Sequence, residues 1–169
     1  MAFELYIPAN LNFRDYIAIV QTARAFADGY DCKDEIRLRA VLASFVTADY
    51  TGVSESLGCK TYTSEEFITT FLSPHALGKK DLLTQHLLGQ PYFICVTTEK
   101  IIVEWQQLAG HGKAIPDGEG TGFTKRTSDR CNGMSYMKQV YTKVNGEWKI
   151  AGLEPTVLYE TGDFEGIRK

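Results

Sequence analysis

The sequence predicts an α+β domain in which N-terminal helices cover a strongly curved, cone-shaped sheet, antiparallel or mixed. The first half of the chain repeats apolar residues at three- and four-residue steps, as amphipathic helices do. The second half contains long runs of β-branched and aromatic residues, which are typical of strands. No helical pattern separates the last three runs, which favours one bent sheet over a flat ferredoxin-like sandwich. A small-molecule site is expected in the open mouth of such a cone.

Three helices are predicted in the first half. The first covers residues 13–30 behind an Asn12 cap, and the second covers residues 33–42. The third begins at Thr63, because the spacing from Thr63 to Glu66 fits a capping box.

The second half predicts long strands of a curved sheet, at residues 91–98, 100–108, 134–144 and 147–153. Asn145-Gly146 between the last two is a strong hairpin signal. The glycine-rich residues 110–122 predict a loop.

Length and charge limit the class of protein. A chain of 169 residues predicts a single domain over residues 1–169. Because 18 Lys and Arg face 21 Asp and Glu without a basic run, neither nucleic acid nor a membrane surface is an expected partner. The N-terminus shows no signal-peptide pattern, and no apolar run reaches the roughly 18 residues of a membrane span. We therefore expect a cytoplasmic protein.

The four cysteines are far apart and form no CxxC pair, so the usual zinc signatures are absent and reduced thiols are expected. No metal site is predicted. The aromatic content of 12% indicates either an aromatic core or a pocket walled by rings.

Three histidines are candidates for acid–base chemistry. His75, beside a proline in a predicted loop, is interpreted as a solvated imidazole. His86 lies just ahead of the first predicted strand among residues that should be buried, and His111 follows a strand where the cone should open. Each of these two is either a satisfied core histidine or a functional one.

Two tyrosines and an aspartate end apolar segments. Tyr30 and Asp31 close the first helix, and Tyr50 follows the apolar segment that ends at residue 49. The tyrosines fit core residues with a hydroxyl reaching outward, and an aspartate here fits a helix cap, more plausibly Asp34 than Asp31. Spacing alone leaves these alternatives open.

Taken together, several stretches resemble the scytalone dehydratase family of fungal polyketide enzymes. They are FADGYDCKDEIRLRAVLASFVTADY, LLTQHLLG, the lone histidine after a strand, and GEWKIAGLEPTVLYETGDFEGI, in order between about Phe13 and Ile167. The resemblance implies the cone-shaped fold of nuclear transport factor 2 (NTF2-like), a homotrimer with one pocket per subunit, and no metal or organic cofactor.

The resemblance also implies a reaction, the loss of water from a cyclic hydroxyketone that becomes aromatic. His86 would be the base that removes the proton next to the carbonyl, and Tyr30 and Tyr50 would polarise the carbonyl oxygen. His111 would be a second imidazole, held by Asp31. Histidine and tyrosine suit these two roles. An ordinary imidazole has a pKa of about 6.5 and can accept a proton near neutral pH, whereas a phenol has a pKa of about 10 and stays protonated.

Three further positions follow from the resemblance. Ser135 matches a serine that hydrogen-bonds the base histidine, and Phe164 matches an aromatic residue that covers the pocket. Met137 falls where the family carries an asparagine, so one polar contact with the substrate is replaced by an apolar thioether.

Three functions are compatible with this pattern. The first is a cofactor-free dehydratase acting on a small aromatic or polyketide-derived hydroxyketone in fungal pigment or secondary-metabolite synthesis. The second, favoured by Met137, is a cyclase, isomerase or pericyclase using the same pocket. The third is a non-catalytic binding module, against which the joint presence of tyrosine, aspartate and histidine argues. Either enzyme reading requires His86 and His111 to lie within about 10 Å of each other, so that they can share one substrate.

Overall fold

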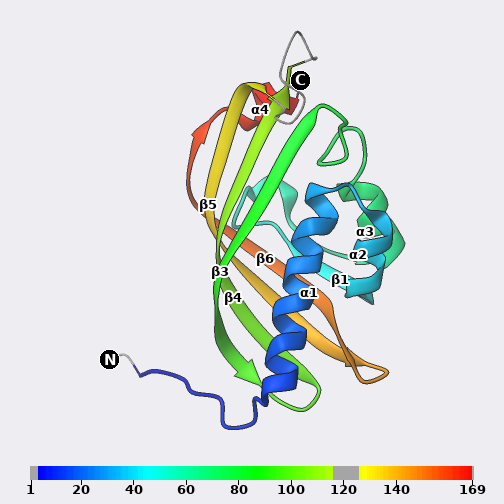
Figure 1. Cartoon of the computed structure of the whole chain (residues 1–169), viewed down its shortest axis with the longest axis vertical. Helices are drawn as coiled ribbons and strands as arrows, with labels where there is room; N and C mark the ends of the chain where they lie inside the picture. The colour runs from blue at the N-terminus through cyan, green and yellow to red at the C-terminus, as the bar shows by residue number, and fades with distance from the viewer. Residues whose placement is uncertain (1–3, 116–125, 169) are drawn as a thin grey trace.

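The computed structural model describes residues 4–115 and 126–168 (Figure 1). Its helices are α1 (Phe13–Asp31), α2 (Glu35–Val41), the short 3-10 helix η1 (Glu55–Leu57), α3 (Ser64–Phe71) and α4 (Phe164–Arg168). Its strands are β1 (Leu42–Asp49), β2 (Cys59–Thr63), β3 (Leu82–Val96), β4 (Lys100–Ala114), β5 (Thr127–Val144) and β6 (Glu147–Gly162).

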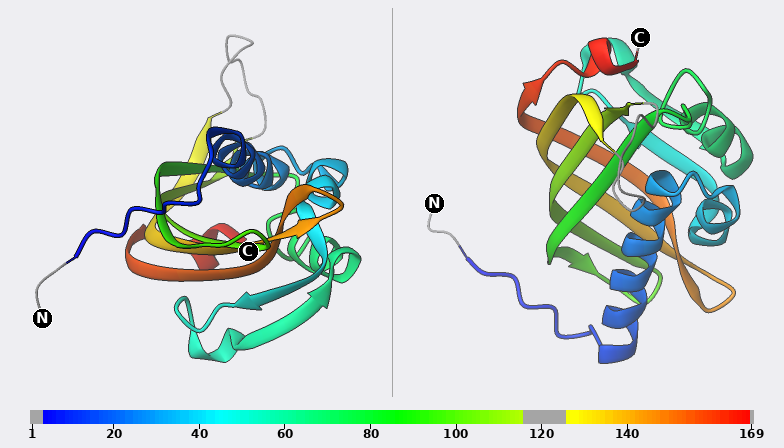
Figure 2. Two further views of the ribbon diagram at one scale, coloured as in Figure 1. Left: turned by 90° about the horizontal axis from the view of Figure 1, so that it is seen from below. Right: turned by 45° about the horizontal axis from the view of Figure 1, so that its top comes forward.

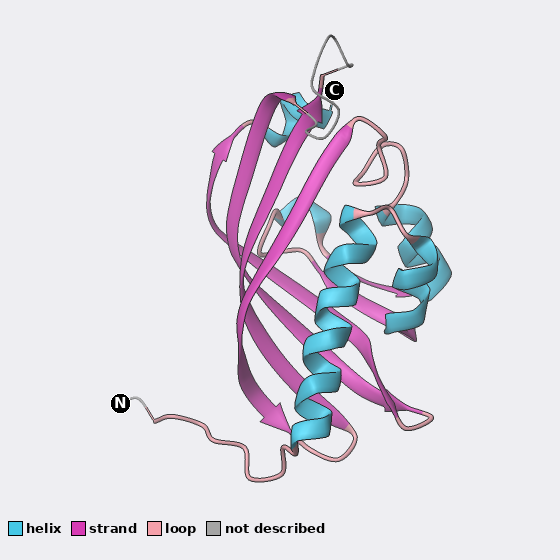
Figure 3. Ribbon diagram, viewed as in Figure 1, coloured by secondary structure: helices cyan, strands magenta, loops and turns pink. Residues whose placement is uncertain are grey.

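The six strands form one curled sheet in the order β2-β1-β6-β5-β4-β3. The pair β1–β6 is parallel and the other pairs are antiparallel, so the sheet is mixed. The long strands are strongly bent, and α1, α2 and α3 lie on the concave side of the sheet (Figures 2 and 3). The predicted α+β cone is confirmed, and the sheet remains open because β2 and β3 are free edges.

The apolar stripe of α1 accounts for the packing of that helix on the sheet. Ile19 and Ala23 are fully buried, and they belong to the same core cluster as Trp105 and Tyr141 of the inner sheet face. Burying a large apolar side chain contributes about 1.5–3 kcal/mol, so this stripe anchors the helix across the hollow.

The helix-start signals are confirmed. The Asn12 side chain accepts a hydrogen bond from a backbone N–H of the first turn of α1, and Asp34 does the same for α2. Thr63 and Glu66 form the predicted capping box at the start of α3. Each cap satisfies backbone N–H groups that the helix leaves without a partner.

The hairpin between β5 and β6 is also confirmed. Asn145 and Gly146 both have positive φ, 52° and 85°. Two consecutive residues in this region match the right-handed twist of the strands that they join.

Gly29 explains how closely α1 and α2 approach each other. A Cβ atom at this position would lie 2.6 Å from Cγ and Cδ2 of Leu38, which is fully buried in α2. The carbonyl of Gly29 also accepts a hydrogen bond from the Asp34 N–H at 2.8 Å. The chain therefore turns sharply after α1, and the end of that helix faces β3.

Several predicted boundaries are wrong. Neither β1 nor β2 is among the predicted strands; the apolar run of β1 lacks strict alternation, and the predicted second helix ends at Leu42, where β1 begins. β3 begins at Leu82, so His86 lies within a strand instead of ahead of one. β4 continues to Ala114, so His111 also lies inside a strand and the predicted loop is wrong over residues 110–114. Residues 116–122 of that loop lie outside the described residues.

The reason is strand pairing. Gly110 pairs with Asn132 and Gly112 with Arg130, and this ladder of backbone hydrogen bonds outweighs the weak strand propensity of glycine. Among residues 4–115 and 126–168, no helix is long and apolar enough to cross a membrane.

Candidate active site

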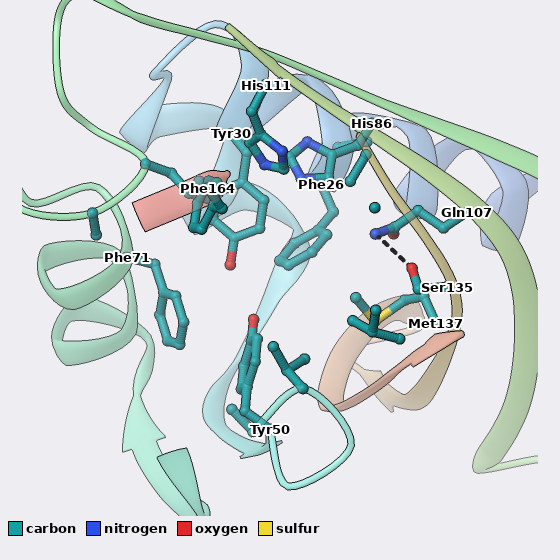
Figure 4. Close-up of a pocket in the computed structure, with 18 of the residues that line it drawn as sticks. Phe26, Tyr30, Tyr50, Phe71, His86, Gln107, His111, Ser135, Met137 and Phe164 are labelled. Atoms are coloured by element: carbon teal, nitrogen blue, oxygen red, sulfur yellow. Dashed lines mark hydrogen bonds between the residues drawn. The ribbon is translucent and has the colours of Figure 1, made fainter. Parts of the chain in front are cut away.

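The hollow of the cone contains a cavity of about 410 Å³ (Figure 4). This volume lies in the range of small-molecule sites, roughly 300–1,000 Å³. Seven of the eight residues singled out from the sequence line it: Tyr30, Tyr50, His86, His111, Ser135, Met137 and Phe164. The eighth, Asp31, lies behind the wall, where it contacts His86. The structure thus brings together residues from α1, four strands or their ends, and α4.

Asp31 and His86 form a tight pair. Oδ1 of Asp31 lies 2.7 Å from Nδ1 of His86, and Oδ2 accepts the backbone N–H of His86 at 2.8 Å. The two side chains are only 13% and 11% exposed. Asp31 therefore holds both the ring and the backbone of His86. The expectation that Asp31 holds His111 is wrong, because the end of α1 points at β3 and His86 is the imidazole nearest to it.

The pair also determines which imidazole nitrogen is free. Burial alone would raise the pKa of Asp31, but hydrogen bonds with His86 and Thr84 and the charge of His86 hold it below its ordinary value. An ionised carboxylate can only accept hydrogen bonds, so Nδ1 of His86 carries a proton. In neutral His86 the remaining nitrogen, Nε2, is therefore the basic atom.

His111 lies beside His86 because of the register of β3 and β4. Thr84 pairs directly with His111, so that Thr84, His86 and His111 lie on one face of the strand pair. The two imidazole centroids are 5.7 Å apart, well within the 10 Å limit set above. Burial and the charge of His86 lower the pKa of His111 to about 4, which keeps this ring neutral at pH 7. Its Nδ1 is buried and has no hydrogen-bond partner among the residues described.

The two phenols come from the end of α1 and from the residue after β1. Figure 4 shows the hydroxyls of Tyr30 and Tyr50 pointing toward each other across part of the cavity. Burial raises the pKa of Tyr50 to about 12 and that of Tyr30 well above its ordinary value, so both stay protonated. Within the described part of the chain, the buried Tyr30 hydroxyl has no partner in hydrogen-bond geometry. An unsatisfied buried donor is costly, and it is therefore ready to bind an oxygen of a ligand.

The wall opposite the phenols is formed by β4 and β5. The Ser135 hydroxyl accepts a hydrogen bond from Nε2 of Gln107 at 3.5 Å, and this bond replaces the expected one between Ser135 and the base histidine. Met137 is 6% exposed and lines the cavity beside this pair.

Gln107 was missed by the sequence reasoning, as was Gln139, which also lines the cavity and accepts a hydrogen bond from Tyr141. The signal that could have found Gln107 is a polar residue at an inward-facing position of an alternating strand.

Phe164 closes the cavity from α4, and its ring centroid lies 4.6 Å from that of His111. Among the described residues, no group of three or more His, Cys, Asp or Glu side chains is arranged to hold a metal ion.

Comparison with known proteins identifies relatives along almost the whole chain. The model of a family described as scytalone dehydratase matches residues 10–169. Dehydratase cfoI from Aspergillus candidus is 41% identical over 169 residues, covering 100% of this chain and 97% of that protein. Scytalone dehydratase arp1 from Aspergillus fumigatus is 31% identical over 161 residues, covering 93% of this chain and 90% of that one.

Solved structures share the architecture. The Kfla4162 protein from Kribbella flavida superposes with a TM-score of 0.73 at 15% identity, covering 92% of this chain and 97% of that one. Likeness at this identity shows the fold alone, and NTF2-like proteins are among the similar structures, as predicted.

Proposed function

Since the chain belongs to the scytalone dehydratase family, we propose that it is a cofactor-free dehydratase acting on a cyclic hydroxyketone in fungal pigment or polyketide synthesis. The observation that carries this proposal is the placement of the Asp31–His86 pair and two protonated phenols around one cavity. Abstraction of a proton next to a ketone needs both a base and donors to the oxygen where negative charge develops.

Each group has one role in the proposed reaction. Nε2 of His86 takes the proton from the carbon next to the ketone, and the electron pair moves onto the carbonyl oxygen. Hydroxyl donors from Tyr30 and Tyr50 stabilise that oxygen. When the electrons return, the carbon–oxygen bond to the β-hydroxyl breaks, and the imidazolium gives its proton to the leaving oxygen. The products are an enone, which tautomerises to a phenol, and water.

The magnitudes are sufficient. A positioned base typically contributes 10²–10⁴-fold, and one donor to the developing oxyanion about 10²–10³-fold. Aromatisation of the product supplies the driving force, so no further electrophile is needed in this proposal.

The cavity wall suits an uncharged substrate. Apart from its two imidazoles, the only ionisable side chain with an ordinarily charged form among the described lining residues is Glu160, which is solvent-exposed. A small aromatic or polyketide-derived ketone fits this surface better than an acid or a phosphate.

A second candidate is a cyclase, isomerase or pericyclase, favoured by Met137. A thioether replaces a hydrogen-bonding side chain there, so the wall beside Ser135 and Gln107 is more apolar and could enclose a reactive intermediate without removing water.

We also propose a homotrimer in the cytoplasm. Large apolar side chains are exposed on the outer face of the long strands, where one copy could cover another: Leu87, Leu108, Leu158 and Tyr159. Light scattering on the purified protein measures its mass directly, and a monomer would contradict this assembly.

The decisive experiment incubates purified protein with scytalone and follows the product by mass spectrometry. We expect a product lighter by one water, and we expect His86→Ala to lose at least about 10²-fold in rate with an unchanged circular dichroism spectrum. Full activity of that variant would contradict the dehydratase mechanism. A product of unchanged mass would favour the second candidate.

A further inference from the structure

Lys33 lies just behind the Asp31–His86 pair, at the point where the chain leaves α1. Its φ of 56° is in the left-handed region, which is unusual for a residue other than glycine. Its backbone N–H bonds the carbonyl of Tyr30 at 3.2 Å, so the turn is tied to the last turn of the helix. The side chain is half-buried, and its ammonium pairs with a hydroxyl on β3.

Three hydrogen bonds connect this ammonium to the imidazole. Nζ of Lys33 lies 3.3 Å from Oγ1 of Thr84, Oγ1 of Thr84 lies 3.0 Å from Oδ1 of Asp31, and the same Oδ1 lies 2.7 Å from Nδ1 of His86. This series of hydrogen bonds starts in the turn after α1, crosses to Thr84 on β3, returns to Asp31 at the end of α1 and ends at His86 on β3, and it joins residues 51 to 55 positions apart. It exists only in the folded protein.

The ammonium of Lys33 and the carboxylate of Asp31 determine which atom donates in each of these hydrogen bonds. An ammonium can only donate, so the Thr84 oxygen accepts from Lys33. The single hydroxyl proton of Thr84 is then free to be donated to Asp31. The ionised carboxylate of Asp31 accepts this hydrogen bond and also the one from Nδ1–H of His86. Lys33 thereby favours the one arrangement in which Nε2 of neutral His86 is unprotonated.

The positive charge of Lys33 also favours the neutral form of His86. Asp31 alone would stabilise a positive charge on His86, because opposite charges attract at short range. The positive charge of Lys33 on the far side of the carboxylate opposes that stabilisation. Burial lowers the pKa of Lys33 while the charge of Asp31 raises it. Among the described residues, the titratable groups around His86 and Lys33 are Asp31 and Tyr30 from α1, the thiol of Cys32 directly after that helix, and His111 from β4.

We propose that Lys33 is a positioning residue that acts through Thr84 and Asp31 to hold His86 as a neutral base with Nε2 free. This inference rests on the proposed function for its catalytic meaning. Its structural content concerns only the protonation of His86, which can be measured without a substrate.

The test is an NMR titration of His86 in the free protein, comparing Lys33→Met with the unmodified chain. The ¹⁵N shifts of neutral His86 should show a protonated Nδ1 in the unmodified protein. In Lys33→Met the midpoint of the His86 titration should rise by about one pH unit, as expected for loss of a nearby positive charge. In the pH profile of kcat/KM, the midpoint of the acidic limb should move to higher pH by the same amount, with KM nearly unchanged.

Three further variants separate the causes. Lys33→Arg keeps the charge and the donor and should behave like the unmodified protein. Lys33→Gln keeps a donor without the charge, so it should preserve the Nδ1–H form while still raising the midpoint, and it serves if Lys33→Met does not fold. Lys80→Met removes an equal charge from an exposed side chain and should leave His86 unchanged.

If Lys33→Met and Lys33→Gln are folded and the midpoint of the His86 titration is unchanged or lowered in both, the inference is overturned. If the midpoint rises while the protein has no dehydratase activity on scytalone, the positioning role holds and the proposed function fails. The two outcomes are therefore distinguishable.

Discussion

The two sides of the cavity are built on opposite principles. On the side of His86, the side chains of His86, Asp31, Thr84 and Lys33 are joined by hydrogen bonds of 2.7–3.3 Å. On the phenol side, the Tyr30 hydroxyl is buried and has no partner among the described residues. In the proposed reaction the base must be held in one protonation state before the substrate arrives, whereas the phenols must keep a donor unused until an oxyanion develops.

The largest expected effect on activity comes from substituting Asp31, which holds His86. Asp31→Asn should lower kcat by about 10²–10⁴-fold, because an amide no longer fixes the orientation and protonation of the imidazole. Steady-state kinetics with scytalone measure it. Asp34→Asn is the matched control, since Asp34 caps α2 and pairs with the exposed Arg37, away from His86, and asparagine caps equally well. A loss below tenfold in Asp31→Asn would show that the pair is not required.

The phenol side should respond in activity but not in stability. Tyr30→Phe should lower kcat by roughly 10–10³-fold and change the free energy of unfolding by less than about 1 kcal/mol, since among the described residues the hydroxyl has only the neighbouring Tyr50 phenol nearby and no partner in hydrogen-bond geometry. Denaturant unfolding and kinetics on the same sample measure both.

Tyr141 provides the contrasting phenol, because its buried hydroxyl donates to Gln139. Tyr141→Phe should destabilise the protein by about 1–3 kcal/mol, since an amide oxygen is left unpaired. If Tyr30→Phe destabilised as much as Tyr141→Phe, the phenol side would be structural and the contrast between the two sides would fail.

His111 predicts a pH dependence of stability. Its pKa is about 4 in the folded protein, below the ordinary value of 6.5, so the unfolded chain binds more protons between these limits. Stability should be complete above pH 6.5 and fall by roughly 1–3 kcal/mol as the pH drops toward 4. Urea unfolding across this range measures it, and His111→Gln should remove that part of the slope. A slope unaffected by the substitution would mean that His111 is solvated.

The smallest expected effect comes from a substitution of Met137, in the cavity wall formed by β4 and β5. Met137→Asn introduces an amide beside Ser135 and should improve kcat/KM for scytalone-like hydroxyketones by up to about tenfold, the equivalent of one hydrogen bond. Substrate competition assays measure the preference. No change would indicate that Met137 does not occupy the position of the family asparagine.

Much of the fold could be predicted because its signals are local. Thr63 and Glu66 are three residues apart, and Asn145 and Gly146 are adjacent, so their geometry depends on little beyond themselves. β1 and the glycine-rich end of β4 could not be predicted, because their conformation comes from pairing with strands distant in the sequence.

The site shows the same division. Sequence together with family resemblance identified seven side chains that line one cavity and an eighth, Asp31, that holds His86. They did not identify the imidazole that Asp31 holds, the partner of Ser135, or the position of Lys33 behind the pair. Each of these depends on contacts between segments that the fold alone brings together.

The sequence by itself predicted the α+β cone, through hydrophobic periodicity, and it supplied the histidines, tyrosines and aspartate to which the family resemblance assigned candidate roles. Only the tertiary structure decided which of these groups is fixed and which is left unsatisfied. The physical reason is that short-range patterns set helices and turns, whereas strand register and the crossing of α1 over β3 set distances of 2.7–3.3 Å between side chains more than 50 residues apart.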